Sequence, residues 1–100
     1  MKPVKVQSQA LRELRKARSY LDRQTPGLGD ELLVEVLESL SKIERDNLIG
    51  VRYEETRFRF YRLKRFSYVI FYECMPDRVR VVAIAHSRRR PGYWMRRKPE

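Results

Sequence analysis

The last third of the chain holds the residues whose types suit chemistry. His86, the only histidine, follows four apolar residues (82–85) at the expected end of a strand, and three arginines (88–90) come almost directly after it. Neighbouring positive charge disfavours a protonated imidazole, so His86 could act as a general base near neutral pH. No carboxylate or nucleophile lies close in sequence. The favoured interpretation is therefore that His86 hydrogen-bonds a neighbouring strand or the tail and only fixes geometry.

The arginine run opens a basic tail that begins at about residue 87. Such charge runs are usually solvated and disordered. Tyr93 and Trp94 argue for order in the first half, because large apolar side chains usually occupy a pocket, and Pro91-Gly92 is typical of a turn that brings them back to the sheet. We expect order through about Trp94 and fraying beyond it. The arginines would then form a cationic surface suited to phosphate or carboxylate groups.

Charge and length define the class of protein. The chain has 100 residues, which predicts one domain with a single modest core over 1–100. Lys and Arg number 23 against 13 Asp and Glu, a formal net charge of +10. Such a field favours polyanionic partners, whether a nucleic acid, a membrane surface or an acidic protein. Charge alone does not choose among them.

Several kinds of site are excluded or disfavoured. The one cysteine, Cys74, rules out an intramolecular disulfide and a multi-cysteine zinc site, and its apolar run (69–74) predicts a buried thiol. The sequence has no P-loop, no dinucleotide signature and no nucleophile elbow, so we expect neither cofactor nor metal. Residues 1–6 lack the apolar core of a signal peptide, and no run is long enough to span a membrane. A soluble, cytoplasmic protein is expected, with no membrane partner.

The first half of the chain predicts a strand followed by a helical hairpin. Residues 4–7 could form a short edge strand, Ser8 could N-cap a helix over 9–24, and Thr25-Pro26 could begin a second helix. The second helix has apolar residues at three- and four-residue steps, namely Leu33, Val36, Leu37, Leu40 and Ile43. Short connections make the two helices antiparallel.

The second half changes to a strand pattern. Residues 57–63 alternate, and 68–73 and 79–85 are rich in β-branched and aromatic residues, with turns at 64–67 and 75–78. The expected fold is α+β in the order βααβββ, with the helical hairpin packed on one face of a small antiparallel sheet. The other face could expose an aromatic patch flanked by arginines, for a protein or nucleic acid, or the tail could fold over and bury it.

The order of these motifs resembles the RelE/ParE superfamily, the toxins of bacterial type II toxin–antitoxin and plasmid-stabilisation systems. The most specific segments are R-F-x-Y-x-I-x-Y over 65–72 and I-A-H-x-R-R-x-P-x-Y-W-x-x-R over 84–97. Weaker similarity covers 20–33 and the start of the first helix, at Ser8, Ala10, Glu13 and Leu14. The superfamily fold, a helical hairpin against a small antiparallel sheet, agrees with the fold expected from periodicity.

The resemblance implies two alternative activities. ParE-like members inhibit DNA gyrase, and the tail is closer to this plasmid-stabilisation branch. RelE-like members are ribosome-dependent, metal-independent endoribonucleases that cut mRNA. In that case His86 would be the base, Arg65 and Arg88 the phosphate clamps, and Tyr93 the acid. Whether the chain is an enzyme therefore stays open, as do a non-toxic basic nucleic-acid-binding domain and an inactive relic.

The resemblance also implies partners. An acidic, partly disordered antitoxin would form a hetero-oligomer with the chain, and DNA gyrase or the ribosome with its mRNA would be the cellular target. The side chains expected to contact the target or a nucleic acid are Arg57, Arg59, Arg62, Lys64, Arg65, Arg88, Arg89, Arg90 and Trp94.

Overall fold

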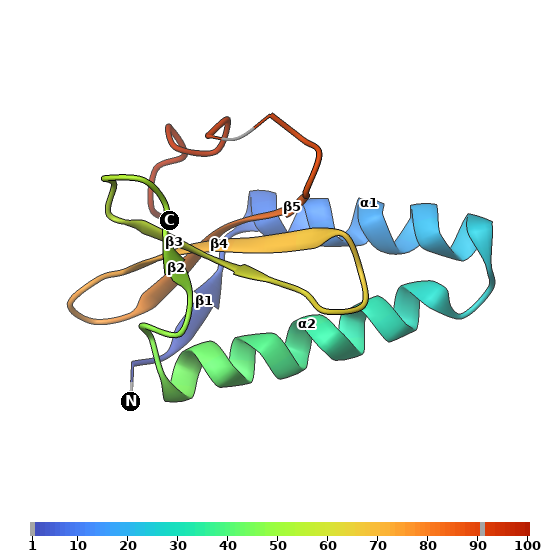
Figure 1. Ribbon diagram of the computed structural model, residues 1–100, viewed down its shortest axis with the longest axis horizontal. Coiled ribbons are helices and arrows are strands. Elements are labelled where there is room, and N and C mark those ends of the chain that lie inside the picture. Colours follow the sequence, from blue (N-terminus) through green and yellow to red (C-terminus); the bar gives the residue numbers. More distant parts are fainter. Residues whose placement is uncertain (1, 91) are drawn as a thin grey trace.

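The computed structural model describes residues 2–90 and 92–100 and confirms the α+β fold. In chain order its elements are β1 (Val4–Val6), α1 (Ser8–Gln24), α2 (Leu28–Arg45), β2 (Val51–Arg52), β3 (Phe58–Arg62), β4 (Tyr68–Cys74) and β5 (Val79–His86). Figure 1 shows α1 and α2 as an antiparallel hairpin beside the sheet. Within the described ranges, no helix combines the length and apolarity needed to cross a membrane.

The five strands form one mixed sheet in the order β1-β5-β4-β3-β2. The meander β3-β4-β5 is antiparallel as expected, whereas the edge strand β1 pairs parallel with β5. β2 was not predicted, because two exposed residues carry no alternating pattern. Phe71 pairs with Ala83 and Tyr72 with Val81, so Val82 is an extra residue in β5. This bulge places Val82 and Ala83 together on the face that the tail covers.

The helices bury one face of the sheet. The inward side of α1 consists of Ala10, Leu14 and Ala17, and the two alanines let the helix approach β5 closely. From α2 the buried residues are Gly29, Leu32, Val36, Ser39 and Ile43. Leu37, which the periodicity placed among the apolar residues of this helix, points outward and is 56% exposed.

The expected helix boundaries need two corrections. Ser8 is the first residue of α1 and not its cap, and no side chain from the N-cap position caps this helix. Thr25 ends α1, its N–H donating to the Leu21 carbonyl at 2.9 Å, and α2 begins at Leu28. Gly27 adopts φ 92° between the helices. A left-handed turn of this kind favours glycine, which explains why the second helix starts later than Thr25-Pro26.

Cys74 is exposed, contrary to the expected buried thiol. It is the last residue of β4, where the cover over the strand ends, and its Sγ lies 3.7 Å from the Asn47 carbonyl oxygen. The apolar run before it misled the sequence interpretation, because burial stops within one residue at a strand end.

Gly29→Ala is expected to destabilise the fold by about 1–3 kcal/mol, the usual cost of overpacking. An added Cβ would lie 2.6 Å from the Arg18 carbonyl oxygen and 2.8 Å from Asp22 Oδ2. This clash outweighs the gain in helix propensity, about 1 kcal/mol. Urea unfolding measures the change, with exposed Ser19→Ala on α1 as control. A Gly29→Ala protein as stable as the control would contradict the close helix contact.

Candidate functional site

The tail folds over the sheet face that the helices leave free. Trp94 is fully buried there, with ring centroids 4.7 Å from Phe58, 4.5 Å from Phe71 and 5.3 Å from Tyr53. Its Nε1 is buried and has no hydrogen-bond partner within the described part of the chain. Apolar and aromatic packing therefore holds the indole in place. The sequence left open whether this face is exposed or is covered by the tail. The structure shows that the tail covers it.

The Glu13 carboxylate on α1 anchors the tail. Arg97 donates to both of its oxygens, at 3.1 and 3.0 Å, and the Tyr93 hydroxyl donates to Oε2. The Ile84 backbone N–H donates to Oε1 at 3.0 Å, and a guanidinium nitrogen of Arg89 lies 3.5 Å from Oε2. Because the Glu13 side chain is only 11% exposed, these partners replace the water that its charge loses.

A buried ion pair forms a second anchor. Arg80 is fully buried, and its Nε and Nη2 donate to Glu73 Oε2 at 2.9 and 2.6 Å. Its Nη1 donates to Gln7 and, at 2.9 Å, to the carbonyl of Arg97. Gln7 in turn donates to the Lys98 carbonyl at 2.9 Å. Removing one partner of a buried pair typically costs about 3–5 kcal/mol, so Glu73 holds Arg80 firmly within the sheet. The hydrogen bonds to the carbonyls of Arg97 and Lys98 then tie the tail to the core.

The end of the chain is also held, contrary to the expected fraying beyond Trp94. The Ser8 backbone N–H and hydroxyl both donate to Glu100 Oε1 at 3.1 Å. These hydrogen bonds, the backbone one first, lower the pKa of Glu100. The carboxylate thereby caps the N-terminus of α1, which has no cap of its own. The partners lie about ninety positions away along the chain, which sequence periodicity does not reveal.

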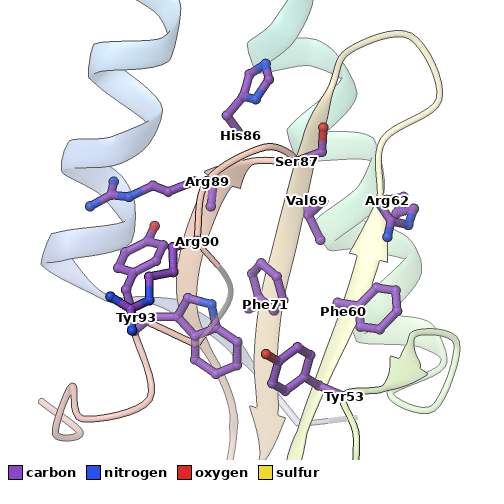
Figure 2. A pocket seen from close by; sticks show the side chains of 12 residues that line it. Tyr53, Phe60, Arg62, Val69, Phe71, His86, Ser87, Arg89, Arg90 and Tyr93 are labelled. Carbon is purple, nitrogen blue, oxygen red and sulfur yellow. The ribbon is translucent and has the colours of Figure 1, made fainter.

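A pocket of about 100 Å³ lies between the tail and strands β3 and β4. Its floor is aromatic and apolar, formed by Tyr53, Phe60, Val69, Phe71, Ala85 and Trp94. Its rim is polar and cationic, formed by Arg62, His86, Ser87, Arg89, Arg90 and Tyr93. Figure 2 shows Arg62 and Arg89 on opposite sides of the aromatic rings. The arrangement suits a partner group with an apolar or planar body and a negative charge.

His86 is exposed and its ring points away from the aromatic floor (Figure 2). Its Nδ1 accepts the Arg88 backbone N–H at 3.1 Å, and its ring meets Tyr68 edge-on at 5.2 Å between centroids. With Nδ1 occupied as an acceptor, a neutral imidazole carries its proton on Nε2. The visible contacts of His86 thus fix the turn that follows β5.

The four residues of the nuclease hypothesis do not converge. His86 and Tyr93 line the pocket, but Arg65 lies in another groove, between α2 and β3, and pairs with Glu31 at 2.6 Å. Arg88 is not among the lining residues. Burial first, and then the hydrogen bond to Glu13, raise the pKa of Tyr93 well above its ordinary 10. Its proton is therefore held toward the helix.

The residues expected to contact the target differ in whether they already have a structural partner. Arg57 pairs with Glu73 at 2.9 Å and Arg59 donates to the Gly50 carbonyl at 2.7 Å, so both have structural partners. Lys64 and Arg65 flank the separate α2–β3 groove. Trp94, expected to touch the target, is buried and supports the pocket from below. Four of the expected residues are exposed and have no ion-pair partner among residues 2–90 and 92–100, and these are Arg62, Lys64, Arg88 and Arg90.

Sequence reasoning missed the residues that hold the site together, Glu13, Arg80 and Arg97. A signal existed for two of them. Glu13 is an acid on a strongly basic helix, adjacent to its apolar stripe, and Arg80 interrupts a run of valines in a central strand. A charge at such a position must be paired.

Over the described ranges, no group of three His, Cys, Asp or Glu side chains could hold a metal ion.

Comparison with known proteins places the chain. Residues 4–91 match the family model described as the ParE toxin of the type II toxin–antitoxin system, parDE. The fold is similar to that of a solved structure, the chromosomal ParDE TA system from P. aeruginosa, with a TM-score of 0.78 and 13% sequence identity. That superposition covers 86% of this chain and 96% of the other. No curated protein sequence matches the chain.

Arg97→Gln is expected to loosen the tail, because Glu13 loses its bidentate partner and the Val82 carbonyl loses its guanidinium donor. Trp94 is the only tryptophan, so its fluorescence reports directly on the tail. We expect red-shifted emission and stronger acrylamide quenching while circular dichroism still shows the folded helices. The control is Arg96→Gln, an exposed neighbour of equal charge. Unchanged Trp94 emission in Arg97→Gln would refute the anchor.

The raised pKa of Tyr93 predicts how the tail responds to alkali. Because folding favours the neutral phenol, its contribution to stability is complete below about pH 10 and is lost only as pH rises through the raised value. The tyrosinate absorbance of wild type minus Tyr93→Phe should therefore stay flat through pH 10. A step near pH 10 in that difference would show that Tyr93 ionises like a solvated tyrosine.

Proposed function

The chain belongs to the ParE toxin family of type II toxin–antitoxin systems, and we propose that it inhibits DNA gyrase in the cytoplasm until a cognate antitoxin neutralises it. The observation that carries the proposal is the arginine-rimmed pocket, whose floor and rim are held by the anchored tail. Fixed cations around an apolar floor suit a binding inhibitor. Of the groups that would transfer protons in a nuclease, the Tyr93 hydroxyl donates to Glu13 and His86 Nδ1 accepts the Arg88 N–H.

The apolar outer side of α2 supports an antitoxin partner. Val34 and Leu37 are each 56% exposed, and Leu48 and Val51, beyond the end of the helix, are 64% and 60% exposed. Neighbouring exposed apolar residues typically mark a protein interface. We propose that the antitoxin covers this side with an apolar segment and sends acidic residues to the basic rim, forming a hetero-oligomer.

The second candidate function is ribosome-dependent mRNA cleavage. One observation favours it, the presence of both His86 and Tyr93 at the rim of the same pocket. The two candidates differ in what they need from His86, since a nuclease needs the imidazole and a gyrase inhibitor does not.

Two parallel assays separate the candidates. Purified protein is added to gyrase with relaxed plasmid DNA, and to ribosomes translating a defined message. We expect loss of supercoiling with intact message, and the same outcome for His86→Ala. Cleaved message that depends on His86 would overturn the gyrase proposal in favour of the nuclease. A protein inactive in both assays would leave the family assignment without either activity.

Arg62→Ala/Arg90→Ala should weaken gyrase inhibition by about tenfold or more, because exposed arginines at an interface are frequent hot spots. Neither side chain has an ion-pair partner in the described part of the chain, so the fold should be unaffected. The matched control, Lys42→Ala/Arg45→Ala, removes the same charge from α2. Equal inhibition by both double variants would exclude the pocket rim as the contact surface.

A further inference from the structure

The solvent-facing side of α1 is cationic along its length. The core-facing stripe is Ala10, Leu14 and Ala17, and the helical period places a set of long basic side chains on the outer side. We call this set the α1 cationic face; all its members are exposed, and it comprises Arg12, Arg15, Lys16 and Arg23. In Figure 1, the C-terminal half of α1 extends beyond the sheet.

The acids of α1 do not neutralise this face. Glu13 is taken up by the tail, and Asp22 accepts the Gly29 backbone N–H at 2.8 Å. Among the residues that the structure describes, Arg18 is the one cation of α1 in an ion pair, at 2.8 Å from Asp30. At the N-terminal end Arg12 lies close enough to Glu100 to help lower the pKa of that carboxyl. The rest of the face has its charge free.

Charge is segregated between the two helices. α1 contains five Lys and Arg against two Asp and Glu, whereas α2 contains two against five. The tail adds six cations and one acid over residues 87–100, and its contacts with Glu13 and Ser8 hold it against α1. α1 and the tail therefore form one positively charged side of the molecule, while the exposed apolar residues of α2 lie among the acidic residues of that helix. The two sides suit different partners.

The chemistry of the α1 cationic face narrows the choice of polyanion. A membrane-surface helix would expose its apolar side, but that of α1 is buried in the core. An interface with a protein would have apolar or aromatic anchors among the charges, whereas the exposed nonpolar side chains of α1, Leu11 and Tyr20, lie by the helical period on the two flanks of the face and not between its members. A single strand would be bound through several stacked aromatic side chains, and α1 offers one, Tyr20, at the flank of the face. A row of cations along the helix axis matches the phosphates of a duplex.

We propose that the α1 cationic face is a docking surface for the phosphate backbone of duplex DNA. The choice of DNA over duplex RNA rests on the proposed function, because gyrase holds a DNA segment against which α1 could lie. From Arg12 to Lys16 the helix rises about 6 Å, and from Arg12 to Arg23 about 16 Å. With roughly 3.4 Å of axial rise per phosphate along one strand, this face reaches several successive phosphates.

The test is the salt dependence of binding to a fluorescent DNA duplex, measured by anisotropy. The triple variant Arg12→Gln/Lys16→Gln/Arg23→Gln is compared with Lys42→Gln/Arg45→Gln/Arg52→Gln, which removes the same charge elsewhere. Each phosphate contact contributes about 0.9 to the slope of log K against log salt, so the α1 triple should lower that slope by between about two and three. The control triple should lower it by less than about one.

Three outcomes would overturn the inference. These are equal slopes for the two triple variants, tighter binding of the wild type to an RNA duplex than to DNA, and tighter binding to a single strand. A pull-down with gyrase in the absence of DNA separates this inference from the proposed function. If the α1 triple keeps DNA-free gyrase binding and loses DNA binding, the docking surface is supported. If wild type fails to bind gyrase but binds DNA through α1, the gyrase proposal fails and the docking surface stands.

Discussion

The rest of the structure depends on one constraint, the need to compensate the buried carboxylate of Glu13. A carboxylate on the flank of α1 loses water when the helix packs on β5, and its oxygens must be given other donors. Arg97 and Tyr93 come from the tail and the Ile84 N–H from β5, so a single charge joins helix, sheet and tail. Satisfying Glu13 brings Trp94 down onto the open face of the sheet.

This constraint determines which surfaces of the molecule remain open to partners. The tail packs on the sheet face, where it encloses the aromatic floor of the pocket and places Arg89 and Arg90 at its rim. On α1, Glu13 is bound by the tail, and Asp22 accepts a hydrogen bond from the N-terminus of α2. Neither acid pairs with the outward cations of the helix. α2 retains exposed apolar residues among acids. The proposed target and nucleic acid can thus occupy separate surfaces, while the proposed antitoxin would cover the apolar side of α2 and compete with the target for the basic rim.

Periodicity predicted the elements that bury a regular stripe, such as the α1 stripe around Leu14 and the β3-β4-β5 meander. It failed where long-range contacts decide the outcome. Ser8 donates hydrogen bonds to the distant Glu100. Thr25 ends α1, and the left-handed Gly27 separates it from α2. Cys74 is exposed at the end of its strand. The composition of the site was foreseeable, since Arg62, Arg89 and Arg90 were named from sequence. Its assembly was not, because pairing between Glu13 and Arg97 spans 84 positions.

The measurement that tests this account most directly is gyrase inhibition by Glu13→Ala, compared with Glu38→Ala, which removes an exposed acid from α2. Both proteins should keep their helical circular dichroism. The account predicts that Glu13→Ala loses inhibition because the tail no longer closes the pocket, while Glu38→Ala inhibits like wild type. A folded Glu13→Ala protein with a released tail and undiminished inhibition would contradict it.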